Sequence, residues 1–133
     1  MLTNTHSRRG GFTLVEIMIV VAIIALLAAI AVPNFLRARK RSQATRILND
    51  LRLLDAAQDQ YAIENNKTNA STVAFADLTP YLKSGTALAN SSGNDMFGNA
   101  FTIATVGATP KVSTTTFDLL SDVAPNTFWS PYK

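Results

Sequence analysis

A single carboxylate lies at the start of a long uncharged stretch of the sequence. Glu16 follows Gly10, Gly11 and Phe12 by a few positions, and Ile17 to Val32 contains no polar or charged side chain. A carboxylate inside a bilayer-length helix costs about 2.5–3.5 kcal/mol on insertion scales and normally has a partner. Two chemistries are open: Glu16 reaches the headgroups or is protonated, or it pairs with an α-amine. A cut after Gly11 would create that amine at Phe12, so that Glu16 of one copy could pair with the next copy.

The element that must position Glu16 is a membrane-length helix. The apolar stretch from Phe12 to Leu36 has 25 residues, or roughly 37 Å at about 1.5 Å per residue, enough to cross a hydrocarbon core of about 30 Å. A cleaved secretory signal ending near Ala29-Ile30-Ala31 is the alternative, although such a signal has a shorter apolar region and no acid near its start. Ser7-Arg8-Arg9 alone is a weak twin-arginine pattern.

The helical pattern continues beyond Pro33. Because proline has no N–H to bond the carbonyl of Ala29, we expect a kink or a loosened turn near residues 29–33. After it, residues recur at spacings of three and four on one face, which predicts an amphipathic helix to about Asn65 whose stripe packs in a core or against a partner helix. The stripe consists of Ala44, Ile47, Leu48, Leu51, Leu54, Gln58, Tyr61 and Ala62, and the opposite face carries Arg46, Asn49, Arg52, Asp59 and Gln60.

Basic residues gather just after the apolar stretch, although the net charge is only +3. The cluster has three interpretations: a solvated face that meets anionic headgroups, a surface that neutralises acidic residues of neighbouring subunits, or a DNA-binding site. Aromatic residues that could stack on bases do not interleave with these charges, so we expect no nucleic-acid partner. The cluster is Arg37, Arg39, Lys40, Arg41 and Arg46.

The rest of the chain is polar and rich in loops. Beyond about Asn66 it is rich in Thr, Ser, Asn and Ala, and residues 77–82 suggest a short helical turn. Residues 100–106 and 111–120 alternate apolar and polar side chains, which predicts two strands joined through residues 107–110. The predicted fold class is α+β: one long N-terminal helix, with a membrane half and an amphipathic half, packed on a small antiparallel β-sheet.

The composition argues against catalysis. The chain has no cysteine, and its one histidine, His6, precedes everything that resembles a folded segment. It carries neither a phosphate-binding loop nor a dinucleotide fingerprint. We therefore predict that the chain is not an enzyme, with a secreted or membrane-tethered binding module as the competing class.

The hexapeptide Gly11-Phe12-Thr13-Leu14-Val15-Glu16, the apolar helix after it and Pro33 resemble the N-terminus of type IV prepilins and type II secretion pseudopilins. The resemblance implies that a prepilin peptidase cuts between Gly11 and Phe12 and methylates the new amine of Phe12. It also implies that Glu16 acts in subunit recognition, and that copies pack by their helices, in the part that includes Pro33, in the filament core.

The expected function is therefore a structural subunit of a type IV pilus-like filament. The main interpretation is a type II secretion pseudopilin, and the alternative is a type IV pilus major pilin for adhesion, motility or DNA uptake. The implied partners are further copies of the chain, the prepilin peptidase, an inner-membrane assembly platform and membrane lipid. The predicted regions are a leader (residues 1–11), a transmembrane half-helix (12–36), an amphipathic half-helix (37–65) and a small polar β-rich domain (66–133).

The implied location is the bacterial inner membrane, as a single-pass protein with its C-terminus outside the cytoplasm, and then a periplasmic or extracellular filament. Positive charge alone predicts the opposite orientation, because Arg8 and Arg9 precede the anchor whereas four basic residues follow it directly. The leader motif favours the first orientation, since a cytoplasmic-facing peptidase must reach Gly11.

Two segments of the polar domain resemble parts of major pseudopilins. Residues 95–101, Asp-Met-Phe-Gly-Asn-Ala-Phe, resemble the turn that leads into their sheet, or form an ordinary turn. Residues 117–122 lie where those proteins place a calcium-binding loop. Two carboxylates are few for calcium, so a surface loop is expected there and no cofactor or metal is predicted. The lack of a disulfide favours a pseudopilin or a short pilin without cysteines.

Overall fold

The structure is a computed structural model, and it describes residues 10–133. The predictions that concern His6, Arg8, Arg9 and most of the leader lie outside the described residues. By its internal contacts the chain divides into two units, one ending at Leu36 and one comprising Arg37–Lys133.

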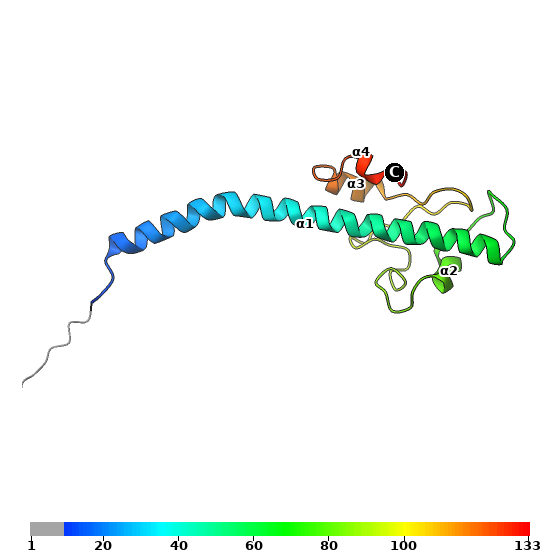
Figure 1. Ribbon diagram of the computed structural model, residues 1–133, viewed down its shortest axis with the longest axis horizontal. Coiled ribbons are helices and arrows are strands. Elements are labelled where there is room, and N and C mark those ends of the chain that lie inside the picture. Colours follow the sequence, from blue (N-terminus) through cyan, green and yellow to red (C-terminus); the bar gives the residue numbers. More distant parts are fainter. Residues whose placement is uncertain (1–9) are drawn as a thin grey trace, which may run out of the picture. The chain divides into compact units, whose positions relative to one another are not determined.

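The long helix α1 comprises Leu14–Glu64, 51 residues, which confirms the predicted helix to within two residues at each end (Figure 1). The helix ends in a cap at Asn66. Asn66 has a positive φ of 49°, a conformation that asparagine tolerates better than most residues. Lys67 N–H then donates to the Ala62 carbonyl at 2.9 Å and Asn66 N–H to the Ile63 carbonyl at 3.4 Å, the pattern of a Schellman cap.

Within the unit Arg37–Lys133, short elements and loops pack along the second half of α1. These elements are α2 (Phe75–Leu78), the 3₁₀-helix η1 (Thr79–Tyr81), α3 (Thr114–Leu120) and α4 (Asn126–Trp129). Figure 1 shows α2 on one side of this part of α1, with α3 and α4 on the other. The helical turn predicted at residues 77–82 corresponds to the end of α2 and η1.

The predicted antiparallel sheet is wrong: residues 10–133 contain no strand, only three isolated antiparallel bridges, Thr72 to Thr105, Asn94 to Ala100 and Thr102 to Lys111. The physical reason is that the backbone of this region bonds to a different partner every few residues. Phe101 N–H donates to Gly93, Val106 N–H to Ser71 and Val112 N–H to Tyr132, each at 2.9 Å. No two neighbouring pairs therefore extend one ladder, and the predicted second strand is helix α3 from Thr114 onward.

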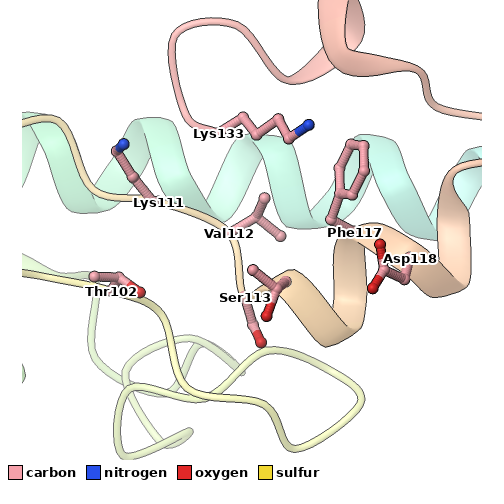
Figure 2. Close-up of a pocket in the computed structure, with 8 residues that line it drawn as sticks. Thr102, Lys111, Val112, Ser113, Phe117, Asp118 and Lys133 are labelled. Atoms are coloured by element: carbon pink, nitrogen blue, oxygen red, sulfur yellow. The ribbon is translucent and has the colours of Figure 1, made fainter.

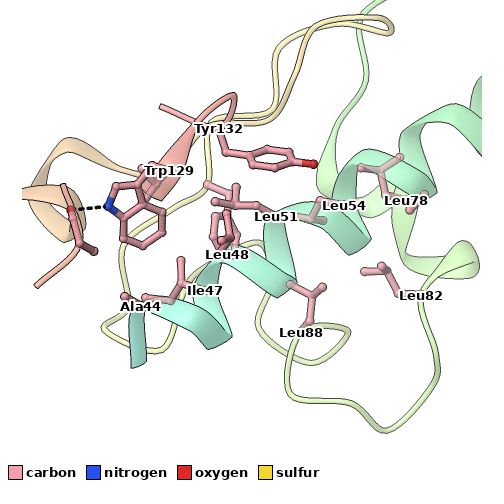
Figure 3. Close-up of a cluster of buried hydrophobic side chains, with 14 of the residues drawn as sticks. Ala44, Ile47, Leu48, Leu51, Leu54, Leu78, Leu82, Leu88, Trp129 and Tyr132 are labelled. Atoms are coloured by element: carbon pink, nitrogen blue, oxygen red, sulfur yellow. Dashed lines mark hydrogen bonds between the residues drawn. The ribbon is translucent and has the colours of Figure 1, made fainter. Parts of the chain in front are cut away.

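The core of this unit is built on the predicted stripe of α1. Ala44, Ile47, Leu51 and Leu54 are fully buried. Figure 3 shows Trp129 near Ala44 and Ile47, and Tyr132 near Leu51 and Leu54. The indole N–H of Trp129 donates to the Ala124 carbonyl at 3.0 Å, so its one polar atom is satisfied inside the core. Leu78 of α2 and Leu82 and Leu88 of the following loop belong to the same cluster.

Candidate assembly site

The first turn of α1 is organised by a reciprocal pair of hydrogen bonds. Thr13 N–H donates to Glu16 Oε2 at 2.8 Å, and Glu16 N–H donates to Thr13 Oγ1 at 3.2 Å. This is a capping box, in which Thr-x-x-Glu satisfies two N–H groups that the helix start leaves free. Sequence reasoning assigned Glu16 to pairing between copies and missed this local role, although the spacing of Thr13 and Glu16 is its signal.

The capping box still leaves Glu16 able to bind a second group. Oε2 accepts the hydrogen bond from Thr13 N–H, whereas Oε1 accepts none within residues 10–133. Both Glu16 and Phe12 are exposed. An ammonium group of another copy could therefore approach Oε1 without breaking the helix start.

The residues before the helix are open to the surroundings. Gly10 and Gly11 are exposed, and a Cβ built on either would meet nothing within 4 Å. Phe12 is 87% exposed. The backbone on both sides of the predicted cleavage position is thus sterically accessible to an enzyme, and cleavage and methylation remain predictions.

The apolar half of α1 has no packing partner among the described residues of its own unit. Every residue from Phe12 to Leu36 is exposed, and an 18-residue window of the helix reaches a mean hydropathy of 3.0 with none of it buried. By length and composition this helix could cross a membrane. An exposed apolar surface of this size requires lipid or other protein to cover it.

Pro33 lies inside α1, and residues on both sides of it belong to one continuous helix from Leu14 to Glu64. Proline removes the N–H that would bond the Ala29 carbonyl, so one backbone acceptor in the apolar half lacks its usual helical partner. The role predicted for Pro33 in helix packing remains a prediction.

The basic cluster after the apolar half contacts the C-terminal segment of the same unit. Lys40 Nζ forms an ion pair with Asp122 Oδ2 at 3.0 Å. The guanidinium of Arg41 lies 4.5 Å from the centroid of the Phe128 ring and also donates to the Val123 carbonyl. Two of the five cations therefore have an intramolecular role that none of the three sequence interpretations included.

Residues 95–99 of the segment 95–101 form a turn, and a buried carboxylate holds it. Asp95, 7% exposed, accepts hydrogen bonds at Oδ1 from the N–H groups of Phe97 at 2.8 Å and Asn99 at 3.0 Å. At Oδ2 it accepts the hydroxyl of the fully buried Thr116, which in turn accepts from Asn99 Nδ2 at 2.9 Å. The turn is thereby joined to α3, and it serves packing rather than an exposed site.

The segment considered for calcium is not a surface loop at its start, because residues 117–120 belong to α3. Asp122 is engaged by Lys40, and no group of three or more His, Cys, Asp or Glu side chains comes together among the described residues. The expectation that the chain binds no cofactor stays a prediction.

A cavity of about 530 Å³ lies beside the start of α3 (Figure 2). Lys111 and Lys133 line it together with hydroxyl groups and a single carboxylate, Asp118. The ammonium of Lys133 lies 3.9 Å from the centroid of the Phe117 ring, so one of the two cations already has an aromatic partner. Among the described residues, Asp118 forms no ion pair with either lysine.

Comparison with known proteins agrees with the reading of the N-terminus. Residues 6–32 match the model of the prokaryotic N-terminal methylation motif. The chain is 44% identical over 77 residues to the type IV major pilin protein of Myxococcus xanthus, covering 56% of this chain and 35% of the relative. It is 44% identical over 68 residues to the type IV wide pilus major component of Thermus thermophilus, covering 51% and 52%.

It is also 37% identical over 60 residues to the type II secretion system core protein G of Klebsiella pneumoniae, covering 45% of this chain and 43% of that protein. The matches thus span about half or less of the length of these relatives. No solved structure matches the chain. The motif and the relatives together confirm the predicted resemblance to the type IV pilin-like family.

Proposed function

We propose that the chain is a structural subunit of a type IV pilus-like filament, assembled by packing of its N-terminal helices. The observation that carries the proposal is the helix that begins directly after the Gly-Phe junction of the methylation motif and exposes an apolar side chain on every face as far as Leu36. Lipid covers this surface before assembly, and the helices of other copies cover it afterwards. The relatives carry the names of pilus and secretion-system components, which supports a structural rather than a catalytic role.

Two kinds of filament fit these observations. A type II secretion pseudopilin is our main proposal, and several relatives named core protein G support it. A type IV pilus major pilin is the second candidate, because the pilin relatives match at 44% identity over longer stretches. Deletion of the gene in the native host separates the two, since loss of secreted enzymes indicates the first and loss of surface pili the second.

The proposed partners act on the start of the chain. A prepilin peptidase cuts between Gly11 and Phe12 and methylates the new amine, and an inner-membrane assembly platform then adds the subunit to the filament. This order requires the unit Arg37–Lys133 to lie outside the cytoplasm. The accessible backbone at Gly10 and Gly11 is compatible with the cleavage.

The first test is the intact mass and N-terminal sequence of the protein recovered from envelope fractions. A chain that starts at methylated Phe12 is expected. A start near Val32, or an intact Met1, would overturn the filament proposal, because the front of the chain would then be a plain signal or anchor.

The role of Glu16 can be separated from its capping role by two substitutions. Glu16→Gln keeps an acceptor for Thr13 N–H and so preserves the capping box, but it removes the charge. Glu16→Ala removes both. We expect both variants to be inserted and cleaved but to assemble at least about tenfold less filament, corresponding to about 1.4 kcal/mol per subunit. Normal filament yield from Glu16→Gln would refute pairing by the charge.

A further inference from the structure

The first residues beyond the apolar half of α1 are almost all positively charged. Between Glu16 and Asp50 the sequence contains no acidic residue that could offset them. Successive residues of a helix are turned by about 100°, so these side chains leave the helix on several sides rather than along one stripe. They form the basic collar, which consists of Arg37, Arg39, Lys40 and Arg41.

The cations of the basic collar differ in what they contact. Lys40 forms an ion pair at 3.0 Å with a carboxylate of the segment 121–128, and Arg41 donates to a backbone carbonyl of the same segment. Arg37 and Arg39 are exposed, and within residues 10–133 neither forms an ion pair. Two charges of the collar therefore remain available to a ligand from outside the chain.

The arrangement of the collar favours an anion with several oxygen atoms. Arg37 lies four residues before Arg41 on the same side of the helix, and like charges at this spacing repel each other. The carboxylate of Asp122 reaches this end of the unit but binds Lys40 instead. An anion beside the guanidinium groups would relieve the repulsion. Guanidinium presents a planar set of N–H donors that matches the oxygens of a phosphate.

The position of the collar along the chain corresponds to the headgroup layer of a bilayer. The collar begins directly after Leu36, and Arg41 follows Arg37 by about 6 Å of helix rise. A bilayer of about 40–45 Å with a hydrocarbon core of about 30 Å has a headgroup layer of about 5–8 Å on each side. When the apolar half fills the hydrocarbon core, the collar therefore lies at the depth of the lipid phosphates.

We propose that the basic collar is a binding site for the headgroups of anionic phospholipids, with Arg37 and Arg39 as its free cations. The ion pair with Asp122 keeps Lys40 from contributing fully. This inference rests on the proposed function, in which lipid surrounds the chain before assembly, and it adds the class of lipid and the residues that select it. Among the three interpretations of the basic residues, the free guanidinium groups next to the apolar half favour this one.

Lipid selection by the full chain tests the proposal. The chain is reconstituted in nanodiscs of equal parts phosphatidylglycerol and phosphatidylcholine and extracted in mild detergent, and mass spectrometry measures the ratio of the two lipids that stay bound. Each free cation should favour phosphatidylglycerol by about fivefold, or about 1 kcal/mol, so the wild type should be enriched about 25-fold. The double variant Arg37→Gln with Arg39→Gln should return the ratio to that of the starting mixture.

Arg52→Gln is the matched control. It removes the same charge from an exposed residue of the same helix, but Arg52 follows Leu36 by sixteen residues, or about 24 Å, beyond the headgroup layer. This variant should select lipid like the wild type. Fluorescence of the buried Trp129 checks that every variant is folded.

Asp122→Asn tests the collar in the opposite direction. It removes the partner of Lys40 and an exposed negative charge, so enrichment of phosphatidylglycerol should rise by up to about fivefold. An unchanged ratio would overturn the part that we assign to the ion pair.

Three results would overturn the site itself. One is a wild type that retains the two lipids equally, and another is an equal loss of enrichment in Arg52→Gln and in the double variant, because net charge alone would then select the lipid. The third is an unchanged ratio in the double variant; a lower filament yield from it would then assign its cations to acidic residues of neighbouring copies. All three leave the proposed function standing, whereas a chain cut near Val32 would lack the apolar half and overturn both.

Discussion

The buried hydroxyl of Thr116 is the clearest place to test how the polar domain is held together. It donates to Oδ2 of the Asp95 carboxylate and accepts from the Asn99 side-chain amide, whereas Oδ1 of Asp95 accepts from the N–H groups of Phe97 and Asn99 in the turn. Valine has the same shape without the hydroxyl. Thr116→Val therefore removes one hydrogen bond to a charged group, worth about 1.5–3 kcal/mol, and one neutral bond, worth about 0.5–1.5 kcal/mol.

We expect Thr116→Val to lower the free energy of unfolding by about 3 kcal/mol. For a domain of this size, about 4–8 °C is lost per kcal/mol, so the melting temperature should fall by about 12–24 °C. The assay is thermal unfolding of the full chain in detergent micelles, followed by the fluorescence of Trp129, the only tryptophan.

Thr115→Val is the matched control, because Thr115 is the exposed neighbour in the same helix and makes the same change in helix propensity. It should change the free energy of unfolding by no more than about 0.5 kcal/mol. If the free energies of unfolding of the two variants differ by no more than about 0.5 kcal/mol, the hydrogen bonds around Asp95 do not stabilise the domain, and our account of the turn is wrong.

Two further predictions concern stability. Gly93→Ala should lower the free energy of unfolding in urea more than Gly85→Ala does. Both glycines have a positive φ, but a Cβ at position 93 would lie 3.1 Å from the Phe75 side chain, whereas position 85 is open. Equal losses of unfolding free energy in the two variants would contradict this prediction. Burial, together with the Asp55 carboxylate, raises the pKa of Tyr132 above its ordinary value of 10.0. Because the folded state keeps this proton longer than the unfolded state, the free energy of unfolding should fall as pH rises above about 10, and Tyr132→Phe should flatten that fall in a pH series.

The long helix was predictable because its information is local and periodic. The stripe from Ala44 to Gln58 is buried, and the face with Arg46, Asn49 and Asp59 is exposed, as the spacing of three and four predicts. The spacing of Thr13 and Glu16, three residues apart, was also a local signal for the start of the helix, but it was not recognised as a capping box.

Alternation of apolar and polar residues alone predicted a sheet that residues 10–133 do not contain. Thr114, Thr115 and Thr116 are β-branched and favour strands, yet they open α3, where Thr116 and Leu120, four apart, are buried together. Burial against the core outweighed local preference. The contacts of the basic cluster were hidden for another reason, because Lys40 meets Asp122 across 82 positions and no local pattern joins them.

The core of this unit is completed by its C-terminal segment, and this determines when the unit can fold. Trp129 and Tyr132 are buried against a part of α1 made far earlier; the Tyr132 hydroxyl bonds Asp55 across 77 positions. Contacts so distant in sequence form late, because the intervening chain must first be ordered. During synthesis, the sides of Ile47 and Leu51 that Trp129 and Tyr132 cover therefore stay open until residues 129–132 have left the ribosome, so this unit completes its core only after its last residues are made.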